Sequence, residues 1–103
     1  MEKSITDIAK ILVEKVKPQK IVLFGSHANG TNNQNSDIDL CLIDNRQGPK
    51  EEKIMEMRRI TKKYLLPIDF LVFNASEFER RKDIYGTIQY EINKNGIKLY
   101  ELE

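Results

Sequence analysis

The chain has 103 residues and a formal net charge of +1, with 40% hydrophobic and 32% charged residues. This length supports one hydrophobic core, so we expect residues 1–103 to form a single domain. The balanced charge excludes attraction of the whole protein to nucleic acid or membrane, and any phosphate binding must be local. With no apolar run long enough for a membrane span and no signal-peptide core, we expect a cytoplasmic protein.

The first quarter of the chain predicts a helix followed by a buried strand. Apolar residues recur at helical spacing at five positions, Ile5, Ile8, Ala9, Leu12 and Val16. Pro18 ends this pattern. Residues 20–24 are apolar after Lys20 and rich in β-branched and aromatic side chains, without alternation, which is typical of a strand covered on both faces. The strand stops at Gly25-Ser26.

A polar loop with an acidic strand follows. Residues 27–36 contain one apolar residue, Ala28, and indicate a loop with room for one helical turn just after Ser26. Apolar residues then alternate with Asp37, Asp39 and Cys41, so residues 38–42 form a second strand whose first end is acidic. We interpret the single cysteine, Cys41, as a core residue.

The second half predicts another helix and another strand. Residues 51–65 have a helical apolar stripe that Pro67 stops. Residues 68–73 then form a third strand, which is apolar except for Asp69. Arg58, Arg59, Lys62 and Lys63 lie on the helix, and we interpret this basic cluster as a solvated face because no aromatic residues alternate with it.

The last quarter predicts a helix and a short edge strand. Ser76 with Glu79 fits a capping box, and the helix runs to Gly96 with a break near Gly86. Residues 97–100 form the edge strand. The whole order predicts an α/β (α+β) fold with a small mixed sheet of about four strands flanked by helices. The second and third strands can be parallel because a helix joins them, whereas the first and second are predicted antiparallel.

Three aspartates carry the predicted chemistry. Asp37 and Asp39 point to one face of their strand, roughly 7 Å apart at the backbone, and Asp69 lies at the corresponding end of the next strand. Carboxylates this close are costly without a cation. Three carboxylates with open water positions suit Mg²⁺, and two such ions about 4 Å apart can promote displacement at phosphorus. Gly25 and Ser26 can hold phosphate oxygens.

Each of these residues also has an ordinary explanation when it is taken alone. Asp37 can be a turn residue at a strand entry, and Asp69 can be a charge that protects an edge strand. His27 can be an exposed loop residue rather than a phosphate contact. A calcium loop is disfavoured because the required glycine and glutamate do not follow. The combination of positions favours the metal site.

The motif resembles a known signature. Gly25-Ser26, ten residues and then Asp37-Ile38-Asp39 is similar to the signature of the DNA polymerase β-type nucleotidyltransferase superfamily. The short chain, Asp69 and the closing residues 95–100 resemble its minimal (MNT) branch. The resemblance covers nearly the whole chain.

The resemblance implies a function for each position. Asp37 and Asp39 would bind the Mg²⁺ ions that hold ATP or another nucleoside triphosphate, Asp69 would complete the site, and Gly25 and Ser26 would hold the β- and γ-phosphates. Members of this branch are often encoded beside a HEPN-domain toxin and transfer AMP from ATP to its tyrosine, acting as the antitoxin. The lack of an apolar span and the mixed charge favour no membrane contact and no direct nucleic-acid binding, and homo- or hetero-oligomers stay open.

One position departs from the family pattern. Arginine often follows the Gly-Ser, whereas this chain has His27, which is not a permanent cation. A second hypothesis is therefore a non-catalytic module that binds nucleotide or partner and neutralises the partner by forming a complex. A third is a subunit of a larger transferase.

Overall fold

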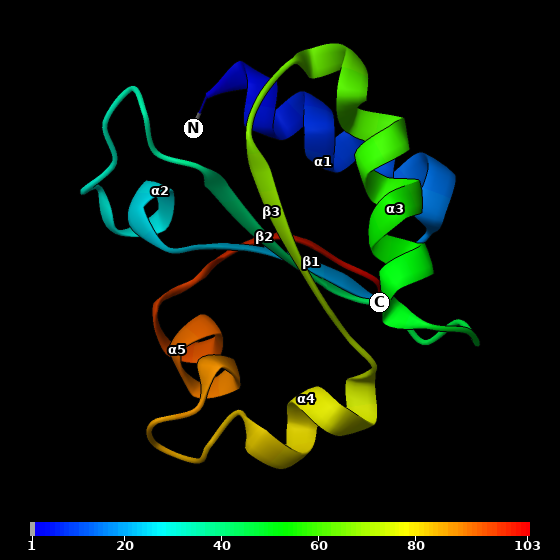
Figure 1. Cartoon of the computed structure of the whole chain (residues 1–103). Helices are drawn as coiled ribbons and strands as arrows, with labels where there is room; N and C mark the ends of the chain where they lie inside the picture. Colours follow the sequence, from blue (N-terminus) through cyan, green and yellow to red (C-terminus); the bar gives the residue numbers. More distant parts are fainter. Residues whose placement is uncertain (1) are drawn as a thin grey trace.

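The computed structural model describes residues 2–103 and contains one sheet between two layers of helices (Figure 1). The elements in chain order are α1 (Lys3–Val16), β1 (Lys20–Phe24), α2 (Ser26–Asn29), β2 (Ile38–Ile43), α3 (Lys50–Thr61), a 3-10 turn η1 (Lys62–Tyr64), β3 (Ile68–Phe73), α4 (Ala75–Arg81), α5 (Ile88–Asn95) and β4 (Ile97–Glu101). Among these described residues, no helix is long and apolar enough to cross a membrane.

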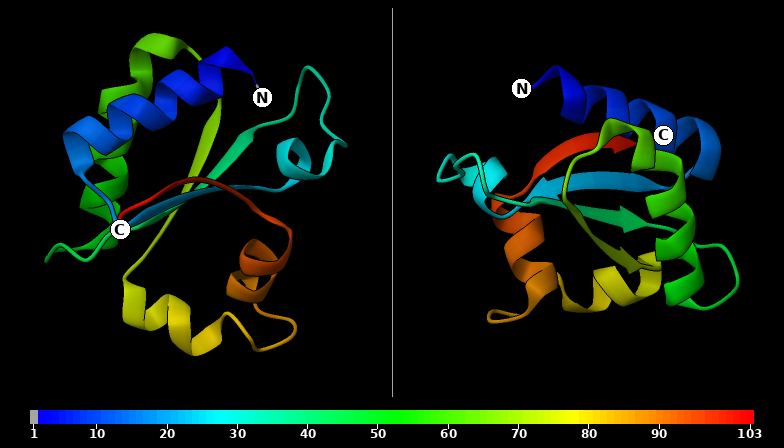
Figure 2. Two further views of the ribbon diagram at one scale, coloured as in Figure 1. Left: turned by 180° about the vertical axis from the view of Figure 1, so that it is seen from behind. Right: turned by 45° about the horizontal axis from the view of Figure 1, so that its top comes forward.

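The sheet is mixed, as predicted. Its strand order is β3-β2-β1-β4, and the right view of Figure 2 shows β4 at one edge and β3 at the other. β1 pairs antiparallel with both β2 and β4, whereas β2 and β3 are parallel. The parallel pair is possible because α3 carries the chain back along the sheet before β3 begins.

Side chains of β2 and β3 alternate between two cores. Leu40 and Phe70 belong to the core under α1 and α3, whereas Cys41 and Phe73 belong to the core over α4 and α5. Figure 1 shows these helix pairs on opposite faces of the sheet. Because faces alternate along a strand, the odd-numbered Asp39 and Asp69 project on the α4–α5 face.

Helix ends differ from the predictions in ways that have physical causes. The predicted helix 51–65 loses its α-helical form after Thr61 and finishes as η1, with Leu65 in the left-handed conformation (φ 55°). Asn74, not Ser76, caps α4, because the Asn74 side chain accepts a 2.7 Å hydrogen bond from the Glu77 N–H. The predicted break near Gly86 is confirmed, since α4 ends at Arg81 and α5 begins at Ile88.

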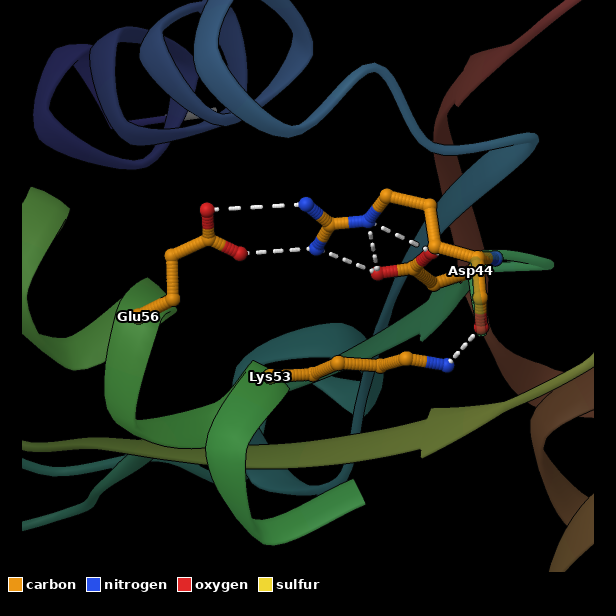
Figure 3. A network of polar contacts seen from close by, with 4 residues as sticks. Asp44, Lys53 and Glu56 are labelled. Carbon is orange, nitrogen blue, oxygen red and sulfur yellow. Dashed lines mark hydrogen bonds and ion pairs between the residues drawn. The ribbon is translucent and has the colours of Figure 1, made fainter. Parts of the chain in front are cut away.

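At the end of β2 opposite to Asp37 and Asp39, the structure has a polar network that the sequence did not indicate (Figure 3). The buried Asp44 carboxylate accepts hydrogen bonds from Arg46 Nε at 3.0 Å and Nη2 at 2.8 Å. Arg46 Nη2 also donates to Glu56 of α3 at 2.7 Å, and Lys53 of α3 donates to the Arg46 carbonyl. The network therefore ties the β2–α3 loop to its helix.

Candidate active site

The predicted site residues lie at one end of the sheet, on three adjacent strands. Phe24 is opposite Asp39 in the β1–β2 pairing, and Asp39 is opposite Asp69 in the β2–β3 pairing. Gly25 directly follows Phe24, so the antiparallel β1 delivers it to the end where β2 and β3 begin. Asp37 precedes β2 by one residue. The fold thus gathers the Gly-Ser turn and the three aspartates from positions far apart in the sequence.

Gly25 and Asp39 occupy complementary space. A Cβ atom at Gly25 would overlap Oδ2 of Asp39 and would lie 3.1 Å from its Cγ atom. Gly25 also has φ 74° and ψ −154°, a backbone region that only glycine adopts readily. The sequence predicted that this glycine admits a ligand, and the structure adds that it makes room for the Asp39 carboxylate.

The three carboxylates interact electrostatically. Partial burial raises the pKa of Asp39 above its ordinary value, and the negative charges of Asp69 and Asp37 raise it further, while His27 opposes the shift. Asp37 and Asp69 are exposed and Asp39 is half-buried. The site therefore carries negative charge, and among the described residues no arginine or lysine contributes to lowering the pKa of Asp39.

The donor set fits a hard divalent cation. Asp37, Asp39 and Asp69 offer only carboxylate oxygens, which are the ligands Mg²⁺ prefers, and a cation would offset both the burial and the carboxylate repulsion that raise the pKa of Asp39. Over the described residues, 2–103, no three acidic, histidine or cysteine side chains are already converged as a metal-binding cluster. The residues fit Mg²⁺ by chemistry and by placement at one sheet end.

The Gly-Ser turn opens a short helix, as the sequence suggested. α2 begins at Ser26, and the first N–H groups of a helix have no partner within it. His27 is half-buried, and its Nε2 lies 3.3 Å from the Ser36 carbonyl oxygen, so its ring joins the start of the polar loop to its end. The interpretation of His27 as an exposed loop residue is therefore wrong, because His27 lies in α2 and is half-buried.

This fold and this arrangement define a class of protein. The chain matches the nucleotidyltransferase domain family over residues 5–95 and belongs to that family. The protein is therefore an enzyme of the nucleotidyltransferase class, as the sequence predicted.

Individual relatives agree with this assignment. The chain is 28% identical over 93 residues to "Putative protein adenylyltransferase MJ0141" of Methanocaldococcus jannaschii, covering 90% of this chain and 88% of that protein. A crystal structure of a toxin–antitoxin with AMP-PNP superposes with a TM-score of 0.70 at 19% identity, covering 99% of this chain and 76% of that one. A mutant of the toxin–antitoxin MntA-HpeT gives a TM-score of 0.67 at 18% identity, covering 94% and 73%. At these identities the two structures establish the fold alone.

Proposed function

We propose that the protein transfers a nucleoside monophosphate, AMP from ATP, to a hydroxyl group of a partner protein. The observation that carries the proposal is the register of Asp39 with Asp69, together with the Asp39 carboxylate seated against Gly25. This arrangement puts candidate phosphate-binding backbone beside candidate metal ligands. The similarity to a protein named as an adenylyltransferase supports a protein as the acceptor.

The site residues would have different roles in the reaction. Gly25 and Ser26 would bind the β- and γ-phosphates, and Asp37, Asp39 and Asp69 would hold Mg²⁺. Mg²⁺ held there would neutralise phosphate charge and make the attacking hydroxyl more acidic. The acceptor oxygen attacks the α-phosphorus of ATP, the bond from that phosphorus to the bridging oxygen breaks, and pyrophosphate leaves. Asp69, as an exposed carboxylate at the outer strand, would accept the proton of the attacking hydroxyl.

The acceptor that we propose is a tyrosine of a HEPN-domain toxin, with this protein acting as its antitoxin. The toxin–antitoxin structures that share the fold support a partner protein in this role. The test incubates the protein with α-labelled ATP, Mg²⁺ and the proposed HEPN-domain partner. We expect label on that protein, loss of label with Asp39→Asn, and full label with Asp83→Asn, an exposed aspartate on the α4–α5 loop. Equal labelling by wild type and Asp39→Asn would contradict the proposal.

One observation favours a second candidate, a non-catalytic module that neutralises its partner by binding. The His27 ring is engaged with the Ser36 carbonyl, which reduces its availability to a triphosphate. The double variant Asp37→Ala/Asp39→Ala separates the two functions. Unchanged neutralisation of the partner favours the binding module, whereas lost neutralisation with binding retained favours catalysis.

A further inference from the structure

The outer edge of β3 is an open hydrogen-bonding edge beside the candidate site. β3 is the last strand of the sheet and pairs only with β2 in the described residues. The Pro67 and Phe73 carbonyls accept bonds from β2 and the residue after it, so odd-numbered β3 residues direct their backbone groups inward. The N–H and C=O groups of the even-numbered residues, including Phe70 and Val72, therefore point away from the sheet.

Arg58 shows that this edge is accessible to a donor. Its Nη1 atom donates to the outward carbonyl of Ile68 at 2.9 Å. Within residues 2–103, the remaining outward groups of β3 have no strand beside them. An open edge of this kind is a template for an extended segment of another chain.

A basic groove with apolar residues runs along this edge. Its volume is about 500 Å³, and its lining includes Arg59, Lys62, Leu65, Leu66 and the β3 residue Phe70. Leu65 is 86% exposed and Leu66 38% exposed, so both leucines add apolar surface to the groove. In the described part of the chain, Arg59 and Lys62 form no ion pair. The groove thus offers uncompensated positive charge and exposed apolar surface together.

We propose that the acceptor protein docks here by adding an extended acidic segment to the edge of β3. A strand at this edge would lie about 4.8 Å from β3, and its side chains would alternate between two faces. One set would enter the groove, where acidic side chains meet Arg59 and Lys62 and apolar ones meet Leu65. The other set would lie on the face of Asp69.

This register has a consequence for the reaction. A residue of the added strand opposite Asp69, on the same face, brings its hydroxyl next to the site carboxylates. The acceptor would therefore be selected by its backbone pairing with β3 and by the charge of the groove. Its hydroxyl would reach the site carboxylates because alternate side chains of the added strand lie on the face of Asp69. The reasoning rests on the proposed function for the transfer step, but the docking itself is measurable without it.

The test uses a short peptide in which tyrosine and glutamate alternate, so that every register places tyrosine on one face and glutamate on the other. A peptide alternating tyrosine and lysine is its control. Residue-resolved amide exchange by NMR should show new protection at Phe70 and Val72 with the acidic peptide and none with the basic one. With α-labelled ATP and Mg²⁺, only the acidic peptide should be labelled.

Charge variants locate the contact. Arg59→Glu/Lys62→Glu should slow labelling about tenfold and weaken the protection, since two attractive charges become repulsive. Lys3→Glu/Lys10→Glu makes the same charge change on exposed α1 positions and should have less than about a twofold effect. Leu65→Asn should weaken labelling about threefold without loss of folding, because asparagine tolerates the left-handed conformation. Leu102→Asn, another exposed leucine, is the matched control.

The possible results separate the docking surface from the reaction. Protection of Phe70 and Val72 without any labelling supports the docking surface and contradicts the transfer reaction. Labelling without protection, equal labelling of the basic peptide, or neither labelling nor protection overturns the docking surface. Protection of these amides that grows with protein concentration in the absence of peptide also overturns the docking surface, because the edge is then covered by a second copy of this chain.

Discussion

Gly25→Ala tests the packing of the candidate site most sharply. The substitution places a methyl group where the Asp39 carboxylate lies, and it also forces alanine into the backbone region at φ 74° and ψ −154°. The conformational strain costs about 2 kcal/mol and the steric overlap about 1 kcal/mol more. We expect a loss of about 3 kcal/mol in the free energy of unfolding, which corresponds to a fall of about 15 °C in Tm for a domain of this size.

Urea unfolding measures this change, and a double-mutant cycle separates the steric contribution from the conformational strain. Asp39→Ala removes the oxygen that the new methyl group meets, so Gly25→Ala should cost about 1 kcal/mol less in that background. Gly48→Ala is the control for strain alone, because Gly48 has φ 113° and no atom lies within 4 Å of the place that its new methyl group would take. A cost of Gly25→Ala no greater than that of Gly48→Ala, together with additivity with Asp39→Ala, would refute the proposed contact.

Three further predictions concern single groups. Arg46→Ala leaves the buried Asp44 carboxylate without its partner and should cost about 2 kcal/mol in urea unfolding at pH 7, against almost nothing for the exposed Arg80→Ala. Burial acts to raise the pKa of Asp44, but the hydrogen bonds and charge of Arg46 outweigh it and hold that pKa below its ordinary value. The stabilisation is therefore complete above about pH 4 and is lost as the pH falls through the folded pKa, so a pH-independent cost of Arg46→Ala would contradict it. The pKa of Asp39 is raised by burial and by the charges of Asp69 and Asp37, so ionisation of Asp39 opposes folding. Asp69→Asn removes one of these charges and should raise the free energy of unfolding in EDTA at pH 7 by up to about 1 kcal/mol. A lower free energy of unfolding would contradict this prediction. Burial raises the pKa of Cys41 to about 12, so its thiol should resist alkylation at pH 8 until urea unfolds the chain, and rapid labelling of the native protein would show that the core is open.

The strands and their order could be predicted because apolar runs and connection lengths determine them. Residues 68–73 form a strand with the predicted ends, and the lack of a full helix between β1 and β2 correctly indicated an antiparallel pair. The ends of helices were less predictable. Asn74 and Ser76 are both favoured capping residues, but α4 begins at Ala75, so Asn74 takes the cap position and accepts from the Glu77 N–H.

Placement of the site was predictable to the level of strands and no further. The positions of Asp39 and Asp69 near strand starts implied that they meet, and the register places them opposite one another. The close approach of the Asp39 carboxylate to Gly25 depends on the β1–β2 register, which no local pattern encodes. The basic cluster containing Arg59 and Lys62 was interpreted as a solvated helix face, and its groove depends on how η1 turns Leu65 outward.

The central claim is that Gly25, Ser26 and the three aspartates form one metal–nucleotide site. Titration of the ¹⁵N-labelled protein with Mn²⁺ and ATP tests it most directly, because bound Mn²⁺ broadens the NMR signals of amides close to it. The account predicts broadening centred on residues 25–26, 37–39 and 69, and its loss in Asp39→Asn. Broadening centred elsewhere, or unchanged broadening in Asp39→Asn, would contradict it.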